Sequence, residues 1–231
     1  MAKDWFAGEV AERYDADTNR RKPPEQAVEF LLPYASGGAL ELAIGTGRVA
    51  VPLAARGVRV AGIDLSPDMV AVLRRKTDAI PVVVGDMTTT SVDGTFSLAY
   101  IVCNSLNNVT TQDGQAAVFA NAAAHLEPGG AFVVEVGVPG KQRLEVFDLS
   151  DTHVGVDEYD FDTQALVSHH FSLIDGAWKR RSIPFRAVYP GELDLMARLA
   201  GLALRERWAD WDRSPFTAES PKHVSVWEKT A

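Results

Sequence analysis

The stretch "ALELAIGTGRVAVPLA", residues 39–54, places a Gly-Thr-Gly turn between two apolar runs. The first run, within 38–44, is short and predicts a buried strand. The second run ends at Gly57 and predicts a helix over 48–57. Glycines between a strand and a helix let the backbone approach a ligand, and the helix N-terminus offers unpaired N–H groups. A small-molecule site is therefore expected at this turn.

A carboxylate lies at the distance that a nucleoside site requires. The next predicted strand, 58–66, ends in Asp64, which is 19 residues after Gly45. An acid at the end of the second strand can accept hydrogen bonds from both ribose hydroxyls. The pattern fits two ligands, a dinucleotide and S-adenosylmethionine.

Three observations favour S-adenosylmethionine. The dinucleotide pattern G-x-G-x-x-G needs a third glycine, and Ala50 stands there. Glu41, just before the turn, would oppose a pyrophosphate and favour a cationic sulfonium or ammonium. The chain also ends in a predicted helix and hairpin, which is unusual for a nucleotide-binding dehydrogenase.

The flanking sequence predicts alternating strands and helices. Helices are expected over 4–14 and 24–34, after Ser66 with Pro67 at the first position, and over 115–130, where Pro-Gly-Gly ends the last one. Further strands are expected over 80–86, 94–105 and 131–138. Five strands alternating with helices predict a parallel sheet covered on both faces.

After residue 140 the predicted elements no longer alternate between strand and helix. Three strands joined by turns are expected over 153–161, 164–174 and 177–189, with Asp175-Gly176 as a hairpin turn. A helix over 190–202 and two closing strands follow.

Composition excludes several classes of function. The net charge of −8 and the absence of a basic cluster argue against nucleic-acid binding. With one cysteine and no metal-ligand spacing, no metal site is expected. The polar N-terminus is no secretory signal, and no apolar run approaches the ~20 residues of a membrane span. A cytoplasmic protein without membrane contact is expected.

The segments "LELAIGTG", "GIDLSPDMV", "VVVGDM", "YIVCNSLNNV" and "LEPGGAFVVEV", within 38–137, together resemble the class I S-adenosylmethionine-dependent methyltransferases. The chain is most similar to small-molecule N-methyltransferases of the glycine and amino-sugar kind. "YDADTNRR" resembles their N-terminal cofactor clasp, "CNSLNNV" their loop after the fourth strand, and "FRAVYPGEL" their return to the main fold.

The resemblance implies a doubly wound α/β fold. Its Rossmann-like sheet would have seven mostly parallel strands, a terminal antiparallel strand, and a small inserted antiparallel β-sheet over the site. We expect a single domain, 1–231. Within it, 1–35 would form a helical clasp, 36–140 and 190–231 the cofactor-binding core, and 141–189 the β cover.

The resemblance also implies roles for individual residues. Asp64 would hold the ribose, Asp86 would accept from the adenine amino group, and Arg21 would pair with the methionine carboxylate. The usual first glycine of the turn is replaced by Ala43. The full set expected to bind the cofactor is Tyr14, Arg21, Glu41, Ala43, Gly45, Gly47, Asp64, Leu65, Met69, Asp86, Met87, Cys103, Asn104 and Asn108.

The acceptor is expected to be a small molecule, methylated on N or O by in-line displacement. "CNSLNNV" favours N slightly, and an O-acceptor, a hydroxyl or a carboxylate, would use a histidine base. Candidates for the acceptor side are His153, His169, His170, Arg186 and Tyr189. Only one of the adjacent His169 and His170 would face inward, depending on the strand register. A nicotinamide oxidoreductase and a non-catalytic nucleoside-binding module are the alternatives, and the oligomer would be a monomer or a homodimer.

Overall fold

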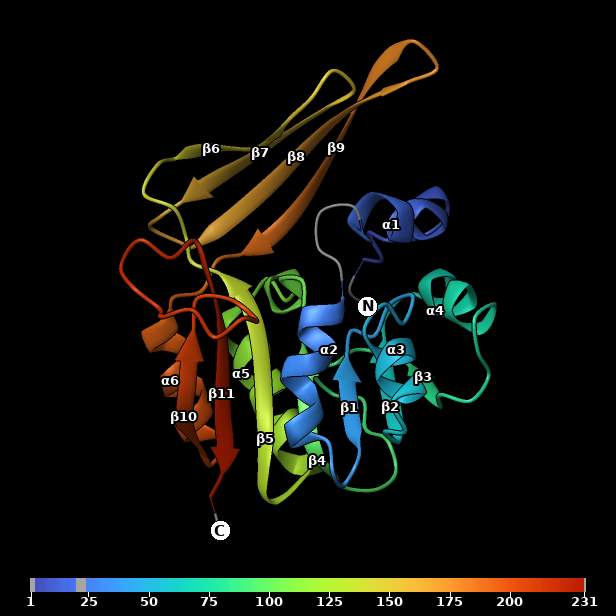
Figure 1. Ribbon diagram of the computed structural model, residues 1–231. Helices are drawn as coiled ribbons and strands as arrows, with labels where there is room; N and C mark the ends of the chain where they lie inside the picture. The colour runs from blue at the N-terminus through green and yellow to red at the C-terminus, as the bar shows by residue number, and fades with distance from the viewer. Residues whose placement is uncertain (1–2, 20–23, 231) are drawn as a thin grey trace.

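A computed structural model of the protein describes residues 3–19 and 24–230, and it arranges them as a layered α/β body with a second sheet above it (Figure 1). In chain order the elements are α1 (Glu9–Asn19), α2 (Glu25–Leu31), η1 (Leu32–Tyr34), β1 (Ala39–Leu42), α3 (Ala50–Ala55), β2 (Val60–Asp64), α4 (Pro67–Arg74), β3 (Val82–Val84), β4 (Phe96–Ile101), η2 (Ser105–Asn108), α5 (Gln112–His125), β5 (Leu126–Gly137), β6 (Leu144–Leu149), β7 (His153–Asp160), β8 (Ala165–Ile174), β9 (Ala177–Arg186), α6 (Pro190–Leu199), β10 (Leu202–Trp208) and β11 (Lys222–Lys229).

The large sheet has seven strands in the order β10-β11-β5-β4-β1-β2-β3. The five strands from β3 to β5 pair in parallel, and β11 runs antiparallel to both β5 and β10. This confirms the predicted Rossmann-like sheet with its closing hairpin. Since parallel strands end at one edge, the turns after β1, β2 and β4 gather there.

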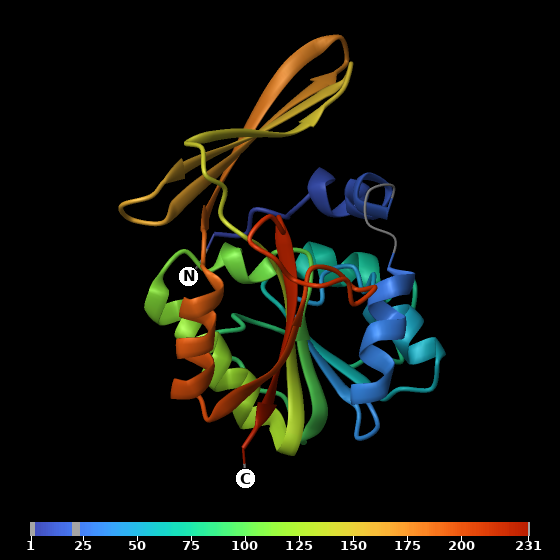
Figure 2. The ribbon, with the colours of Figure 1, turned by 60° about the vertical axis from the view of Figure 1, so that its left-hand side comes forward.

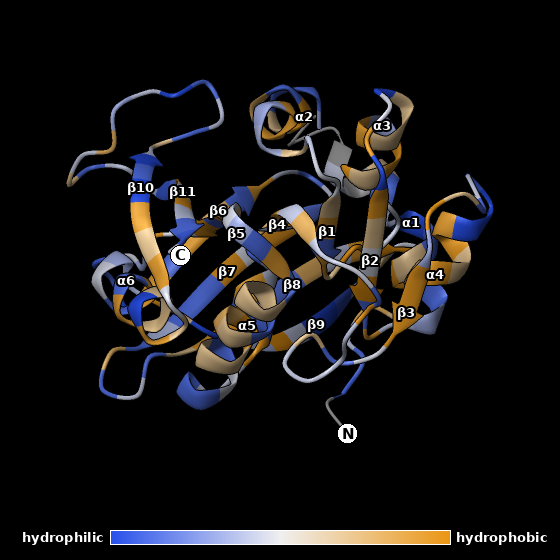
Figure 3. Ribbon diagram, turned by 90° about the horizontal axis from the view of Figure 1, so that it is seen from below, coloured by the Kyte–Doolittle hydropathy of each residue, from blue (hydrophilic) through white to orange (hydrophobic). Residues whose placement is uncertain are grey.

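Helices cover both faces of this sheet, and each face has its own apolar core (Figure 2). Side chains of α5 and α6, such as Phe119 and Leu193, fill one core. Side chains of α2 and α3, such as Leu31 and Leu53, fill the other. Every residue of β1, β2 and β4 is buried, as expected of central parallel strands. Figure 3 shows these apolar strands against the mostly hydrophilic loop between β10 and β11.

The second sheet is inserted between β5 and α6 and has the antiparallel order β6-β7-β8-β9. The sequence predicted three of its strands and missed β6. A register irregularity between Val146 and Asp148 interrupts the period of two, so "LEVFDL" shows no clean alternation. The predicted hairpin turn is confirmed, because Asp175 and Gly176 both have positive φ and join β8 to β9.

Two helix boundaries differ from the prediction. The helix expected over 4–14 begins at Glu9, because the Asp68 carboxylate accepts the Gly8 N–H at 2.7 Å and Gly8 has a φ of +62°. The helix expected over 115–130 runs from Gln112 to His125, and its N-cap is Thr111. Pro128-Gly129-Gly130 therefore lies inside β5 at a register irregularity, where Gly129 has a φ of +78°.

No helix of residues 3–19 and 24–230 is long and apolar enough to cross a bilayer.

A pair of glycine substitutions separates backbone strain from crowding. Gly47 has a φ of +75°, and an added Cβ would lie 2.9 Å from Leu73 Cδ1 in the core. Gly57 has a φ of +87° with nothing within 4 Å of that position. We expect Gly47→Ala to lower the free energy of unfolding by about 2–4 kcal/mol and Gly57→Ala by about 1 kcal/mol, because only the first adds overpacking to strain. Urea denaturation measures both, and equal losses would contradict the crowding.

Candidate functional site

Asp64, at the end of β2, joins the two turns at this edge of the sheet. Its Oδ2 accepts the N–H of Gly45 at 2.6 Å, and its Oδ1 accepts the N–H of Ser66 at 2.8 Å. The side chain is 8% exposed, and burial raises its pKa despite these two bonds. Each carboxylate oxygen can accept a further hydrogen bond, so the group can serve a ligand while it holds the turns.

Glu41 lies beneath the glycine turn. The register of β1 and β4 sets it beside Tyr100, whose hydroxyl donates to Glu41 Oε2 at 2.9 Å. Burial raises the pKa of Glu41 to about 8, and the nearby Arg48 charge opposes that shift only in part. Near neutral pH this acid is therefore largely protonated, so the negative charge that was expected from the sequence to favour a cationic ligand is mostly absent.

The turn itself needs the left-handed backbone region at three alternate residues. Ala43, Gly45 and Gly47 have φ values of +60°, +56° and +75°. Ala43 thus adopts a conformation that glycine adopts more readily. An added Cβ on Gly45 would lie 3.1 Å from Met69 Cε, so the turn passes closely over α4.

Helix α1 is fastened across the turn. The Thr46 hydroxyl donates to Asp15 Oδ1 at 2.5 Å, while Lys76 pairs with Asp15 Oδ2 and donates to the Thr46 carbonyl. Ala11 and Tyr14 of α1 pack in one cluster with Met69 of α4. Burial raises the pKa of the Tyr14 hydroxyl, which lies within electrostatic range of Cys103, Arg48, Asp64 and Glu41. Tyr14 therefore lies over the turn and the end of β4.

The adenine side of the expected site is formed by the ends of β2 and β3. Asp86 Oδ1 accepts the N–H of Thr88 at 2.9 Å and its hydroxyl at 2.7 Å. Met87 and Met69 are buried, whereas Leu65 is 37% exposed beside Asp64. These side chains come from the edge of the sheet at which the resemblance placed them.

The loop after β4 is rigid and strained. Cys103 and Asn104 have φ values of +58° and +61°. Glu135 of β5 accepts the Cys103 N–H at 2.8 Å, and Asn104 Oδ1 accepts the Gly137 N–H at 2.6 Å. Such backbone strain persists only where surrounding contacts enforce it, and it is common at functional sites.

The histidines lie on the second sheet. His170 pairs across the strands with Gly155 and shares a face with Leu166 and Ser168, while His169 lies on the opposite face. His153 Nε2 lies 3.1 Å from His170 Nδ1, and His153 Nδ1 lies 2.5 Å from Asp148 Oδ2. His169 Nδ1 lies 2.8 Å from the Ser182 hydroxyl. His153 and His170 thus form one chain with an acid, and His169 is separate.

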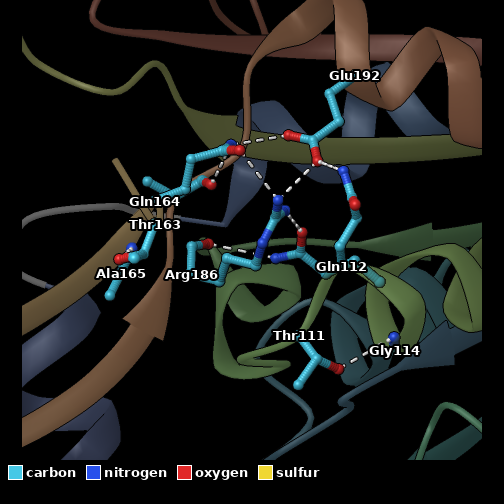
Figure 4. Close-up of polar contacts among 10 residues, drawn as sticks. Thr111, Gln112, Gly114, Thr163, Gln164, Ala165, Arg186 and Glu192 are labelled. Atoms are coloured by element: carbon cyan, nitrogen blue, oxygen red, sulfur yellow. Dashed lines mark hydrogen bonds and ion pairs between the residues drawn. The ribbon is translucent and has the colours of Figure 1, made fainter. Parts of the chain in front are cut away.

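Arg186 ties the second sheet to the helices (Figure 4). Its guanidinium donates to Gln115 Oε1 at 2.6 Å, to Gln164 Oε1 at 3.1 Å and to Glu192 Oε1 at 2.7 Å. The side chain is 6% exposed. Tyr189, three residues later, is the N-cap of α6 and is 43% exposed. Arg186 is therefore held among the elements of the fold, whereas the Tyr189 side chain is open.

The structure thus brings the turn, Asp64, Tyr14 and the loop after β4 together at one edge. The histidines, Arg186 and Tyr189 belong to the second sheet and its root. Arg21 lies outside the described residues. Within residues 3–19 and 24–230, no group of three or more His, Cys, Asp or Glu side chains could hold a metal ion.

Sequence reasoning missed the residues that position this site. Asp15 fastens α1, Tyr100 bonds Glu41, and Glu135 holds the loop after β4. A usable signal existed for Tyr100, because parallel pairing of the first and fourth strands predicts side chains at neighbouring register positions. Asp15 and Glu135 gave no signal, since their partners depend on tertiary packing.

Comparison with known proteins agrees with this geometry. Residues 39–130 match the family model described as "Methyltransferase domain". The chain is similar to the solved CcbJ methyltransferase from Streptomyces caelestis, with 35% identity, 98% of each chain covered and a TM-score of 0.87. It shares the fold of the SAM-bound amino pentose methyltransferase CalS10 from Micromonospora echinaspora, with 18% identity, a TM-score of 0.73, and 99% and 100% of the two chains covered.

Curated relatives include the cypemycin N-terminal methyltransferase from a Streptomyces species, which is 27% identical over 94% of this chain and 95% of its own. A second is the dTDP-3-amino-3,6-dideoxy-alpha-D-glucopyranose N,N-dimethyltransferase from Streptomyces fradiae. That enzyme is 31% identical over 56% of this chain and 54% of its own.

The buried Glu41 predicts a pH dependence of stability. Its pKa in the folded state, about 8, exceeds the ordinary glutamate pKa of 4.5, so the folded chain keeps a proton that the unfolded chain has lost. Stability therefore falls as pH rises from about 4.5 to about 8. In denaturation at pH 5 and pH 7.5, we expect wild type to lose up to about 3 kcal/mol relative to Glu41→Gln. Parallel stability curves for the two proteins would contradict the buried neutral acid.

The Arg186 network predicts a large loss of stability. The side chains of Arg186 and Glu192 are 7% and 14% exposed, whereas those of the Arg205–Glu228 pair are 52% and 45% exposed. Arg186→Met leaves the Glu192 charge buried, so we expect a loss of about 3–5 kcal/mol. Arg205→Met, the matched control, should cost less than about 1 kcal/mol. Urea denaturation compares them, and similar losses would show that the network does not anchor the sheet.

Proposed function

Since this chain belongs to the class I S-adenosylmethionine-dependent methyltransferases, we propose that it transfers the methyl group to an amine nitrogen of a small-molecule acceptor. The resemblance to small-molecule N-methyltransferases is confirmed by the comparisons. The names of these relatives describe N-methylation of amino sugars and of a peptide N-terminus. An aliphatic amine is the acceptor chemistry that those names share.

The observation that carries the proposal is the joint position of Asp64 and the glycine turn. Gly45, within hydrogen-bond distance of Asp64, carries no side chain on its approach to the edge of the sheet. A buried carboxylate beside this bare backbone suits a ribose diol, with the rest of the nucleoside along the ends of β2 and β3. The residues present therefore fit an adenosine cofactor.

We assign the cofactor-side residues on that basis. Asp64 would bind the ribose, Leu65, Met69, Asp86 and Met87 the adenine, and Glu41, Ala43, Gly45 and Gly47 would border the methionine end. Cys103, Asn104 and Asn108 would approach the sulfur. Tyr14 would cover the site from α1, where Asp15 keeps that helix in place.

S-adenosylmethionine supplies an electrophilic methyl group on a sulfonium. The protein's part is to align the acceptor nitrogen with that methyl group and to exclude water; such alignment is worth ~7–11 kcal/mol in favourable cases. The acceptor must arrive as a neutral amine or lose a proton first, and the in-line attack leaves a methylated ammonium. The Tyr14 cover and the second sheet would enclose this step.

An O-acceptor remains the second candidate, and one observation favours it. Asp148, His153 and His170 form a chain in which a carboxylate orients an imidazole, the arrangement of a general base. A hydroxyl acceptor needs such a base, whereas a neutral amine does not. These three residues lie on the outer part of the second sheet, away from its root. An amine is therefore the better supported acceptor.

Ligand-induced stabilisation tests the proposed cofactor. S-adenosylhomocysteine at 100 times its Kd should stabilise wild type by ~2.7 kcal/mol, read as a rise in Tm, and NAD should give no rise. Asp64→Ala should abolish the rise, while Asp113→Ala, an exposed acid on α5, should retain it. A rise with NAD and none with S-adenosylhomocysteine would overturn the proposal, and a full rise in Asp64→Ala would remove the ribose assignment.

A further inference from the structure

The second sheet has one face that is buried near its root and carries acids. On this face, which we call the inner face, Tyr159 pairs with Leu166, and Asp157 pairs with Ser168. Glu145 of β6 lies opposite Asp157. Ser168 is 6% and Tyr159 9% exposed although both lie on an inserted sheet. Glu158 and His169 point to the other face, because side chains alternate along a strand.

The inner face turns away from α5 and α6. Arg186 stands on the other face of β9, and its guanidinium contacts Gln115 of α5 and Glu192 of α6. The root of the inner face meets the segment that follows β5, because Gly140 donates a backbone hydrogen bond to the Tyr159 hydroxyl and lies against the Glu145 carboxylate. The inner face therefore begins beside the carboxyl end of the large sheet.

Three buried side-chain oxygens in the described part of the chain have no hydrogen-bond donor. One is Oδ1 of Asp157 on the inner face. The other two are Oδ1 of Asn107 and Oδ1 of Asn108, in η2 after β4. Asn107 is 7% exposed, so neither the protein nor bulk water satisfies its oxygen. Nine in ten or more buried polar groups in proteins do have a partner, so three in this region indicate a missing donor.

The two groups of oxygens lie on elements that are connected through β9. Helix η2 is in contact with β9 at the root of the second sheet. Asp157 is two strands away from Ile183 of β9, through Ser168 of β8, which is about 10 Å at the usual strand spacing. A molecule that extends from η2 across β9 to the inner face would reach both.

The three unsatisfied oxygens are all acceptors, which decides the chemistry of the occupant. It must bring donors, and two facing carboxylates favour a positive charge. Burial also raises the pKa of Asp157, although the hydrogen bond that Ser168 donates to its carboxylate lowers that pKa in part. A cation there would relieve that cost of burial.

We propose that the acceptor is an aliphatic amine bound as its cation, with Asn107 and Asn108 accepting its N–H groups and the Asp157–Glu145 pair selecting its charge. Before methyl transfer the ammonium gives one proton to the Asp157 carboxylate, and the neutral nitrogen then attacks. This inference rests on the proposed function and assigns the acceptor side of the same site. The histidine chain is less suited to the role, because His170 lies two residues, about 7 Å, farther along β8 from the root than Ser168 does.

Binding to the complex with S-adenosylhomocysteine tests the proposal. The probes are D-glucosamine and L-alanyl-L-alanine amide, each paired with its N-acetyl derivative, in a buffer free of amines. Calorimetry on wild type should show at least one amine bound tenfold or more tightly than its acetylated partner. Asp157→Asn should weaken that binding at least tenfold. Glu158→Gln, the neighbouring residue on the opposite face, should change it less than twofold.

Three outcomes would overturn the proposal: equal binding of an amine and its N-acetyl derivative, no binding of any probe, or unchanged amine affinity in Asp157→Asn. Affinity for S-adenosylhomocysteine is measured in every variant and should stay within twofold of wild type. Its loss in wild type would contradict the proposed function instead, so the two failures are distinguishable. Glu145→Gln replaces Asp157→Asn if the latter does not fold, and the same tenfold loss is expected.

Discussion

The carboxylate of Asp64 is the contact on which the site depends. By accepting one N–H from the glycine turn, 19 residues before it, and one from the start of α4, it fixes these two segments to each other. The turn cannot hold its shape through local preference alone, because Ala43 adopts a positive φ without being a glycine. Charge-assisted bonds to backbone N–H groups are stronger than neutral ones, which makes a buried acid suited to this task.

The glycine turn also positions the N-terminal helix α1. Thr46, between the two glycines, bonds Asp15, and Lys76 holds both, so α1 follows the turn. Tyr14 thereby lies over the edge of the sheet at which β1, β2 and β4 end. A second buried polar group, the Arg186 guanidinium, fixes the inserted sheet through hydrogen bonds, as Asp64 fixes the turn. It gives the root of that sheet fixed partners in α5 and α6.

The sequence predicted the large sheet because its signals are local. Apolar runs, Ser66 as a cap, and the glycines at turns each follow from the residues alone, and the order of the strands follows from the resemblance. β6 was not predicted, because its irregular register removes the alternation of apolar and polar residues on which strand prediction relies. The start of α1 was predicted wrongly, because the carboxylate of Asp68, 60 residues away, accepts the N–H of Gly8. For the site, residue types at strand ends were informative, but the partners that hold them, such as Tyr100 and Glu135, came from strand pairing.

The inserted sheet shows why a histidine is a weak guide to chemistry here. From the sequence, His169 and His170 were the evident candidates, and the register decides between them by placing His170 with Ser168 and Leu166. The same register places Asp157 on that face and closer to the root, where an aspartate in a strand gave no signal. A histidine with a carboxylate partner is satisfied within its own sheet, as His153 is by Asp148. A buried acceptor oxygen without a hydrogen-bond donor is not satisfied in this way. The missing hydrogen bond, rather than the titratable side chain, therefore marks where a ligand completes the structure.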